Sequence, residues 1–451
     1  MKRIPFIILL TLLALPGWAK RDSIHYELAY KAGVMAGWMM PDGKVEEWTG
    51  KRPLLGGSFD VEFLPTGRWH CLQQWNNASI GVGTTYINLG NDDKLGSSFS
   101  AYAYINEPFY NGRHFRIGIR PTVGLAAVTR TYRNTFEGEK LYNGHLNANW
   151  SIGSILNAYL AVRMYLDFPI KDGWTITLDI GWHHISNGSV MHPNAGYNMF
   201  CGNLGLRYAP GSDERHRSKA DLYEEPQPDV PRKLYDGVDK PWAIEISASG
   251  GIRQTYYSDN HNGMLFFGAA TIKASAYWVP VGIFRIGGGI DAFYDGYYKC
   301  VSYSLPDAIA AYPDAPITYF GKTYLYESNI KNCFRVGFSI QPEFLIGRLT
   351  AGLHVGVYLY DPVKNLEPYD KKTDPSDPNY DHNALHPGDE PFHRGIFYNY
   401  DFTKASNYQD GWCYMQFVLK YHVLDHMFIH LGLKTHGVRA EFVDAGLGVA
   451  F

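Results

Sequence analysis

The stretch from Trp174 to Tyr208, WTITLDIGWHHISNGSVMHPNAGYNMFCGNLGLRY, predicts two strands joined by a polar loop. Between Thr175 and Ser186 two kinds of side chain alternate, as they do in a strand with two unlike faces. One face carries, in order, Ile176, Leu178, Ile180, Trp182, His184 and Ser186. The pairs Asn187-Gly188 and Pro193-Asn194 are turn signals in the loop that follows.

The second strand of this pair, from Asn198 to Tyr208, continues the same apolar face. Phe200, Leu204, Leu206 and Tyr208 share one parity. Asn198 has that parity too and stands at the loop end of the strand. We therefore expect His184, Ser186 and Asn198 to lie together, on neighbouring antiparallel strands, where the apolar face ends.

Composition suggests that this apolar face meets lipid. Aromatic residues make up 15% of the 451-residue chain, with 34 Tyr, and Gly occurs 47 times, yet the mean hydropathy is only -0.25. A membrane β-barrel has this profile, because aromatics ring both interfaces while small and polar residues fill the interior. A net charge of -3 gives no sign of nucleic-acid binding. None of the five cysteines has CxxC spacing, so no zinc site or thioredoxin-like motif is predicted, and no cofactor is implied.

The N-terminus has the features of a secretory signal peptide covering residues 1–19. Lys2 and Arg3 precede an apolar run, residues 6–15, that is too short to span a bilayer as a helix. Small residues lead to a predicted cleavage after Ala19, and Lys20 follows rather than the Cys of a lipoprotein. The mature chain is expected to leave the cytoplasm and to reside in the bacterial outer membrane.

Alternating segments predict about eight strands before residue 210 and eight more after residue 240. Residues 211–240 are charged, contain Pro and predict a periplasmic linker. The predicted fold is all-β, a transmembrane antiparallel up-and-down barrel, with one domain at 20–210 and a second at 241–451. Two tandem eight-stranded barrels and one barrel of about sixteen strands both fit. The long linker favours the tandem, because neighbouring barrel strands need only a short periplasmic turn.

The connections alternate between short and long. Predicted inward turns such as Lys171-Asp172-Gly173 and Ile346-Gly347-Arg348 are tight, whereas the predicted outward connections at 129–150, 295–330 and 361–410 are long. Outer-membrane barrels show this asymmetry. The segment 66–77 is longer than an inward turn should be, and the pattern does not explain it.

The motif His184-Ile185-Ser186-Asn187-Gly188 with Pro193-Asn194-Ala195-Gly196 resembles the PagL-type outer-membrane lipid A 3-O-deacylase family. Residues 433–451 are similar to a Bacteroidetes-type variant described as acyloxyacyl hydrolase. The first resemblance implies an eight-stranded barrel that cleaves an acyl ester of lipid A, or lipopolysaccharide, in the outer leaflet.

The same resemblance assigns Ser186 as the nucleophile and His184 as its base, on the lipid-facing surface. The family carries an acid twelve positions after the Ser, and this chain has Asn198 there. Asn can orient a His, but it does not stabilise an imidazolium as a carboxylate does. Asn187 and the backbone N–H groups around Gly188 are candidates for an oxyanion hole, and Asn194 is expected to support the turn.

Other polar residues are expected to have structural roles. His183 has interior parity and is predicted to be a hydrogen-bonded lumen residue. In the second half, His436 also has interior parity and no Ser two residues later, which predicts a non-catalytic domain. The acidic residues of the loop at 374–381 are expected to be solvated. The alternative to an esterase is a non-enzymatic barrel that binds ligands at its loops or passes solutes.

Overall fold

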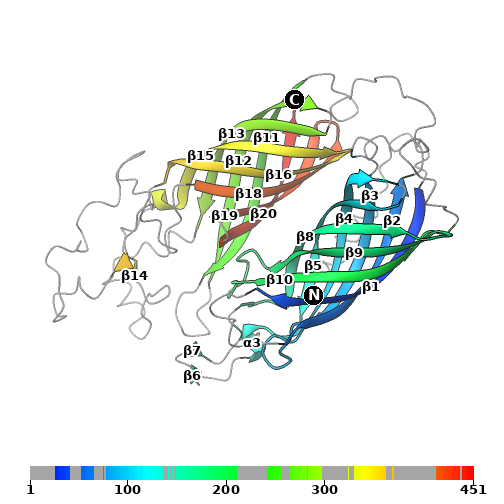
Figure 1. Ribbon diagram of the computed structural model, residues 1–451. Helices are drawn as coiled ribbons and strands as arrows, with labels where there is room; N and C mark the ends of the chain where they lie inside the picture. Colours follow the sequence, from blue (N-terminus) through cyan, green and yellow to red (C-terminus); the bar gives the residue numbers. More distant parts are fainter. Residues whose placement is uncertain are drawn as a thin grey trace.

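In a computed structural model, the chain forms two closed antiparallel barrels of eight strands each (Figure 1). The structure describes residues 26–40, 52–65, 75, 78–112, 114–135, 141–142, 145–146, 149, 151–191, 193–210, 241–255, 265–281, 283–296, 323–324, 330–361, 368–369, 413–436 and 439–451. The tandem-barrel prediction is confirmed. The predicted signal peptide, the linker at 211–240 and the acidic loop at 374–381 lie outside the described residues. None of the helices within the described ranges is long and apolar enough to cross a membrane.

The first barrel closes in the order β1-β10-β9-β8-β5-β4-β3-β2, so that each strand pairs with its neighbour in an up-and-down meander. Its strands are β1 (Tyr26–Met39), β2 (Leu54–Pro65), β3 (Ser79–Asn88), β4 (Ser97–Asn111), β5 (Arg116–Val128), β8 (Leu156–Pro169), β9 (Trp174–Ser186) and β10 (Tyr197–Tyr208). The connection between β5 and β8 carries a short helix, α3 (Tyr132–Thr135), and a small hairpin of β6 (Leu141–Tyr142) and β7 (His145–Leu146).

The second barrel repeats this meander in the order β11-β12-β13-β15-β16-β18-β19-β20. Its strands are β11 (Trp242–Thr255), β12 (Leu265–Val281), β13 (Phe284–Asp295), β15 (Phe334–Ile346), β16 (Leu349–Tyr360), β18 (Cys413–Leu424), β19 (Met427–His436) and β20 (Arg439–Ala450). A 3-10 helix, η2 (Ile330–Cys333), precedes β15, and β14 (Thr323–Tyr324) pairs with β17 (Pro368–Tyr369).

Tight turns and long loops lie at opposite ends of the barrels, as predicted. Between β8 and β9, Asp172 and Gly173 both have positive φ, at 53° and 81°, which a two-residue hairpin turn requires. The loop hairpin β6–β7 of the first barrel and strand β14 of the second lie toward the same end of the molecule (Figure 1).

The strands place apolar side chains outward, and most of the charged side chains that they bury lie in the lumen. On β9 the outward Ile176, Leu178 and Ile180 are exposed, whereas the inward Thr177 and Asp179 are buried. In a soluble protein such an apolar outer surface would be in contact with water, so the alternation is typical of a barrel whose solvent is lipid.

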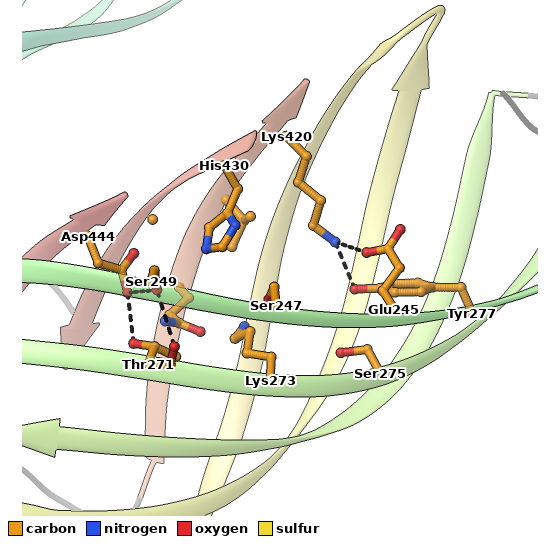
Figure 2. Close-up of a pocket in the computed structure, with 13 residues that line it drawn as sticks. Glu245, Ser247, Ser249, Thr271, Lys273, Ser275, Tyr277, Lys420, His430 and Asp444 are labelled. Carbon is orange, nitrogen blue, oxygen red and sulfur yellow. Dashed lines mark hydrogen bonds and ion pairs between the residues drawn. The ribbon is translucent and has the colours of Figure 1, made fainter. Parts of the chain in front are cut away.

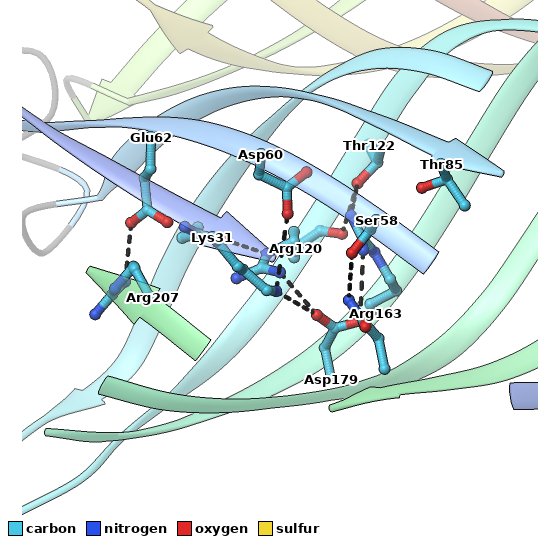
Figure 3. Close-up of polar contacts among 12 residues, drawn as sticks. Lys31, Ser58, Asp60, Glu62, Thr85, Arg120, Thr122, Arg163, Asp179 and Arg207 are labelled. Atoms are coloured by element: carbon cyan, nitrogen blue, oxygen red, sulfur yellow. Dashed lines mark hydrogen bonds and ion pairs between the residues drawn. The ribbon is translucent and has the colours of Figure 1, made fainter. Parts of the chain in front are cut away.

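A network of ion pairs fills the lumen of the first barrel (Figure 3). Asp179 Oδ2 lies 2.8 Å from both Lys31 Nζ and Arg120 Nη1, and its Oδ1 lies 3.4 Å from Arg163 Nη1. These groups come from β1, β5, β8 and β9. A closed barrel of eight strands is just wide enough for its side chains to fill it. The network therefore links four strands through the interior.

The second barrel is filled in the same manner. Glu343 Oε1 lies 2.8 Å from His354 Nε2 and 2.7 Å from Lys420 Nζ, and Lys420 also contacts Glu245 at 2.6 Å. Figure 2 shows Lys420 reaching across the lumen to Glu245 and Tyr277. Ion pairs thus cross both lumens.

Trp75, in the unexplained long connection between β2 and β3, contacts the second barrel. Its Nε1–H donates to the carbonyl of Leu345 at 3.2 Å, and its ring packs edge-on against Phe344 with centroids 5.6 Å apart. Part of this connection thus forms an inter-barrel contact rather than a simple turn.

Candidate active site

The β9–β10 hairpin brings the three predicted residues together. In the register of this hairpin Asn198 stands directly opposite His184, and Ser186 follows two residues later on the same face. The side chains of His184 and Asn198 are half-buried, whereas Ser186 is 7% exposed. The site therefore lies where the lipid-facing stripe of β9 ends at the long-loop end of the barrel.

A chain of hydrogen bonds joins Asn198, His184 and Ser186. The Nδ1 of His184 lies 2.8 Å from Asn198 Oδ1, and its Nε2 lies 2.8 Å from Ser186 Oγ. This is the arrangement of a hydroxyl nucleophile, a base and an orienting group. The parity argument from the sequence placed these side chains on one face, and the geometry places them within hydrogen-bonding distance.

Trp182 determines which nitrogen of His184 carries the proton. The indole Nε1–H can only donate, and it lies 3.2 Å from Asn198 Oδ1, so the atom facing it is the amide oxygen. The same oxygen must accept from His184 Nδ1–H. The Nε2 of His184 is then free of hydrogen and accepts the hydroxyl hydrogen of Ser186. Trp182 therefore fixes the tautomer that a general base needs.

The Trp182 ring also stacks on the imidazole. The two centroids are 5.3 Å apart and the planes differ by 18°. An indole face attracts a cation, so this contact favours a positively charged His184. The sequence placed Trp182 on the same face, two residues before His184, but gave no sign that it would act on that ring.

The loop after Ser186 is held by the side chains of Asn187 and Asn194. The backbone N–H of Asn187 donates to Asn194 Oδ1 at 2.8 Å. The Asn187 amide donates to Ser154 Oγ at 2.8 Å and to the carbonyl of Met191 at 2.7 Å. Both donor groups of Asn187 are thus engaged in the loop itself. Of the predicted oxyanion donors, the backbone around Gly188 remains.

Gly196 packs directly against the candidate catalytic residues. It has a φ of 78°, and a Cβ placed there would be 3.0 Å from His184 Cε1 and 3.2 Å from Ser186 Cβ. Any side chain would push against the imidazole and the serine. Gly196 is therefore required both by its positive φ and by the close approach of His184.

Comparison with protein-family models gives two matches. The model for lipid A 3-O-deacylase (PagL) matches residues 57–207, and the model for the acyloxyacyl hydrolase C-terminal domain matches residues 242–372 and 395–451. The first barrel is a PagL-family domain. The two matches fall on the two barrels, and the site described above lies in the first of them.

The solved structures that match this chain share little sequence identity with it. The crystal structure of the outer membrane enzyme PagL is 16% identical, with 40% of this chain and 98% of that chain covered and a TM-score of 0.25. The FrpB iron transporter from Neisseria meningitidis is 9% identical, with 96% and 71% covered and a TM-score of 0.21. These scores are too low to support an argument. A search of curated proteins found no match.

His183 and His436 both lie in barrel lumens. His183 is buried, and its Nδ1 lies 2.6 Å from the hydroxyl of Tyr159. In the second barrel, His436 Nε2 lies 2.7 Å from the Tyr358 hydroxyl and its Nδ1 lies 3.4 Å from Glu441. Both agree with their predicted interior parity. Within the described ranges, no group of three His, Cys, Asp or Glu side chains is arranged to hold a metal ion.

Proposed function

We propose that this protein is an outer-membrane esterase that removes a fatty-acyl chain from lipid A or lipopolysaccharide, with Ser186 as nucleophile and His184 as base. The hydrogen-bonded chain from Asn198 through His184 to Ser186 carries this proposal. Its position also supports it. The outward surface that leads to the site is apolar, with Trp38 58% and Leu204 56% exposed, as a membrane-embedded approach for an acyl chain requires.

The geometry supports a two-step hydrolysis. His184 Nε2 takes the hydroxyl proton of Ser186 as Oγ attacks the ester carbonyl carbon. The tetrahedral intermediate collapses, and the leaving sugar oxygen receives that proton from His184, which leaves an acyl-serine. Water then gives its proton to His184 and attacks the acyl carbon. The fatty acid departs as the proton returns to Ser186 Oγ.

The Asn198 amide orients His184 without a negative charge, and the Trp182 ring supplies part of the missing stabilisation. A cation stacked on an indole gains about 0.5–2 kcal/mol. The site is thus built to work with a neutral orienting residue, at a lower rate than with a carboxylate.

Asn198→Asp is expected to raise kcat by about fivefold. A hydrogen bond to a charged group is worth about 1 kcal/mol more than a neutral one, and about 1.4 kcal/mol corresponds to a factor of ten in rate. Initial rates of fatty-acid release from lipopolysaccharide micelles measure this. Unchanged or lower kcat in a folded Asp variant would mean that His184 does not acquire charge in the rate-limiting step.

Trp182→Phe is expected to lower kcat by about tenfold, because it keeps an aromatic ring beside His184 but removes the Nε1–H. The Asn198 amide is then able to rotate and stabilise the wrong His184 tautomer, and misplacing a base costs about 1–2 kcal/mol or more. The matched control is Trp174→Phe at the other end of β9, which should retain full kcat. Equal losses of kcat in the two variants would mean that the Trp182 substitution acts through folding and not through His184.

The site itself is tested by incubating purified protein with lipopolysaccharide and measuring the released fatty acid by mass spectrometry. Stoichiometric or greater release is expected. A solute pore receives no support, since ion pairs occupy both lumens. A folded protein that releases no fatty acid from any lipopolysaccharide, including that of its natural membrane, would contradict the proposal.

A further inference from the structure

The loop that follows Ser186 is hydrogen-bonded to the second barrel. The Ser189 hydroxyl donates to the carbonyl of Ala440 at 2.7 Å, and the backbone N–H of Gln254 donates to the carbonyl of Ser189 at 2.9 Å. Ala440 lies on β20 and Gln254 on β11, which are neighbours in the second barrel. The second barrel therefore holds both the hydroxyl and the carbonyl of Ser189.

An apolar contact reinforces these bonds. A Cβ placed on Gly188 would be 2.3 Å from Val443 Cγ2 and 3.2 Å from Leu433 Cδ1. Gly188 thus packs against outward-facing side chains of β20 and β19, with no room for a side chain of its own. Residues 186–189 are all buried although they lie at the outward edge of their own barrel.

The segment held by the second barrel is a tight turn that begins directly after Ser186. Gly188 and Ser189 have φ values of 63° and 65°, and the N–H of Val190 donates to the carbonyl of Asn187 at 3.2 Å. This is a turn of the type I′ class. Among the described residues no acceptor takes the N–H of Gly188, two positions after Ser186.

We propose that the second barrel positions this turn, so that the Gly188 N–H meets the oxyanion formed when Ser186 attacks the ester. Val443 and Ala440 are the positioning residues, and the active site is complete only when the two barrels are docked. This inference rests on the proposed function. It gives the second barrel a role in catalysis although that barrel has no His-Ser pair at His436.

The turn depends on hydrogen-bond partners in the second barrel. In the first barrel alone, the Ser189 hydroxyl and carbonyl would lose Ala440 and Gln254 as partners. Oxyanion donors are effective only when they are fixed before the reaction begins. Docking against β20 supplies that fixation, in addition to the hydrogen bond from Asn187 to Asn194.

A disulfide cross-link tests the docked arrangement without reference to activity. The Cβ of a residue at 188 would lie 3.7 Å from Val443 Cβ, which suits a disulfide. With the native cysteines replaced by Ser, Gly188→Cys with Val443→Cys should cross-link on mild oxidation, as peptide mass spectrometry detects. The control pairs Gly188→Cys with Leu447→Cys, four residues along β20, and should not. Equal yields for the two pairs would overturn the docked arrangement.

Coupled substitutions test the positioning role. Gly188→Ala should lower kcat about 100-fold with little change in KM, because its methyl group displaces the turn from Val443. In a Val443→Ala background the same change should cost only about tenfold, from the remaining backbone strain at positive φ. If the fold losses in kcat of the two single variants simply multiply in the double variant, the positioning role is contradicted. An inactive wild type that cross-links efficiently would overturn the proposed function and the positioning role together, whereas an active wild type that fails to cross-link would overturn the positioning role alone.

Discussion

Ser186→Ala is expected to lower kcat for fatty-acid release by about 10⁴-fold or more, the scale of loss seen when a nucleophile is removed from a serine hydrolase. The substitution removes the single oxygen that lies 2.8 Å from His184 Nε2, and with it the acyl-serine intermediate. KM should change little, because the apolar approach to the site is intact. Single-turnover assays with purified protein in lipopolysaccharide micelles measure the rate.

The matched control for this loss is Ser100→Ala. Ser100 is a buried serine on β4 of the same barrel, facing the lumen. It is expected to retain full activity. Both variants should remain folded, as the shift in gel mobility on heating reports for barrels. A Ser186→Ala variant that keeps a substantial share of the wild-type rate would exclude Ser186 as the nucleophile.

Asp179→Asn is expected to lower the free energy of unfolding of the first barrel by about 3–5 kcal/mol. Removing one partner of a buried ion pair leaves uncompensated charge in a medium of low polarity. Asp179 contacts Lys31, Arg120 and Arg163. Without its charge, the carboxylate that remains near Lys31 is that of Asp60, at 4.0 Å. The strand that carries Asp179 also carries His184 and Ser186. The activity of Asp179→Asn should therefore fall at temperatures where β9 begins to unfold.

Urea titrations in detergent, followed by tryptophan fluorescence, measure this change. The control is Asp172→Asn in the exposed β8–β9 turn, where the Lys171 contact is open to solvent and Asn tolerates the positive φ. Its stability should change by less than about 0.5 kcal/mol. A loss at Asp179 no larger than that at Asp172 would mean that the lumen ion pairs do not determine stability.

Much of the architecture could be predicted because barrel strands have a period of two. The alternation through Ile176, Leu178 and Ile180 identified the lipid face and placed His184 and Ser186 on it. Shared parity put Asn198 on the same face, and the family resemblance, with its orienting residue twelve positions after the serine, assigned it a role beside His184. The long segment at 211–240 separated the two barrels, because adjacent strands of one barrel need only a short turn.

The parts that could not be predicted depend on side-chain conformation or on contacts between distant segments. The hydrogen bond from Trp182 to Asn198 requires a particular rotamer of each. The closeness of Gly196 to His184 depends on the path of the loop. The contacts of Ser189 with Ala440 and of Trp75 with Leu345 join residues 251 and 270 positions apart, and no local pattern reports them.

The most direct test of the central claim is mass spectrometry of lipid A from cells that express the wild-type protein or Ser186→Ala, with lipid A of the native type in the host. The wild type should remove the mass of one fatty-acyl group, and Ser186→Ala should leave lipid A intact while reaching the outer membrane in equal amount. Loss of the acyl group with both proteins, or with neither, would contradict an esterase that acts through Ser186.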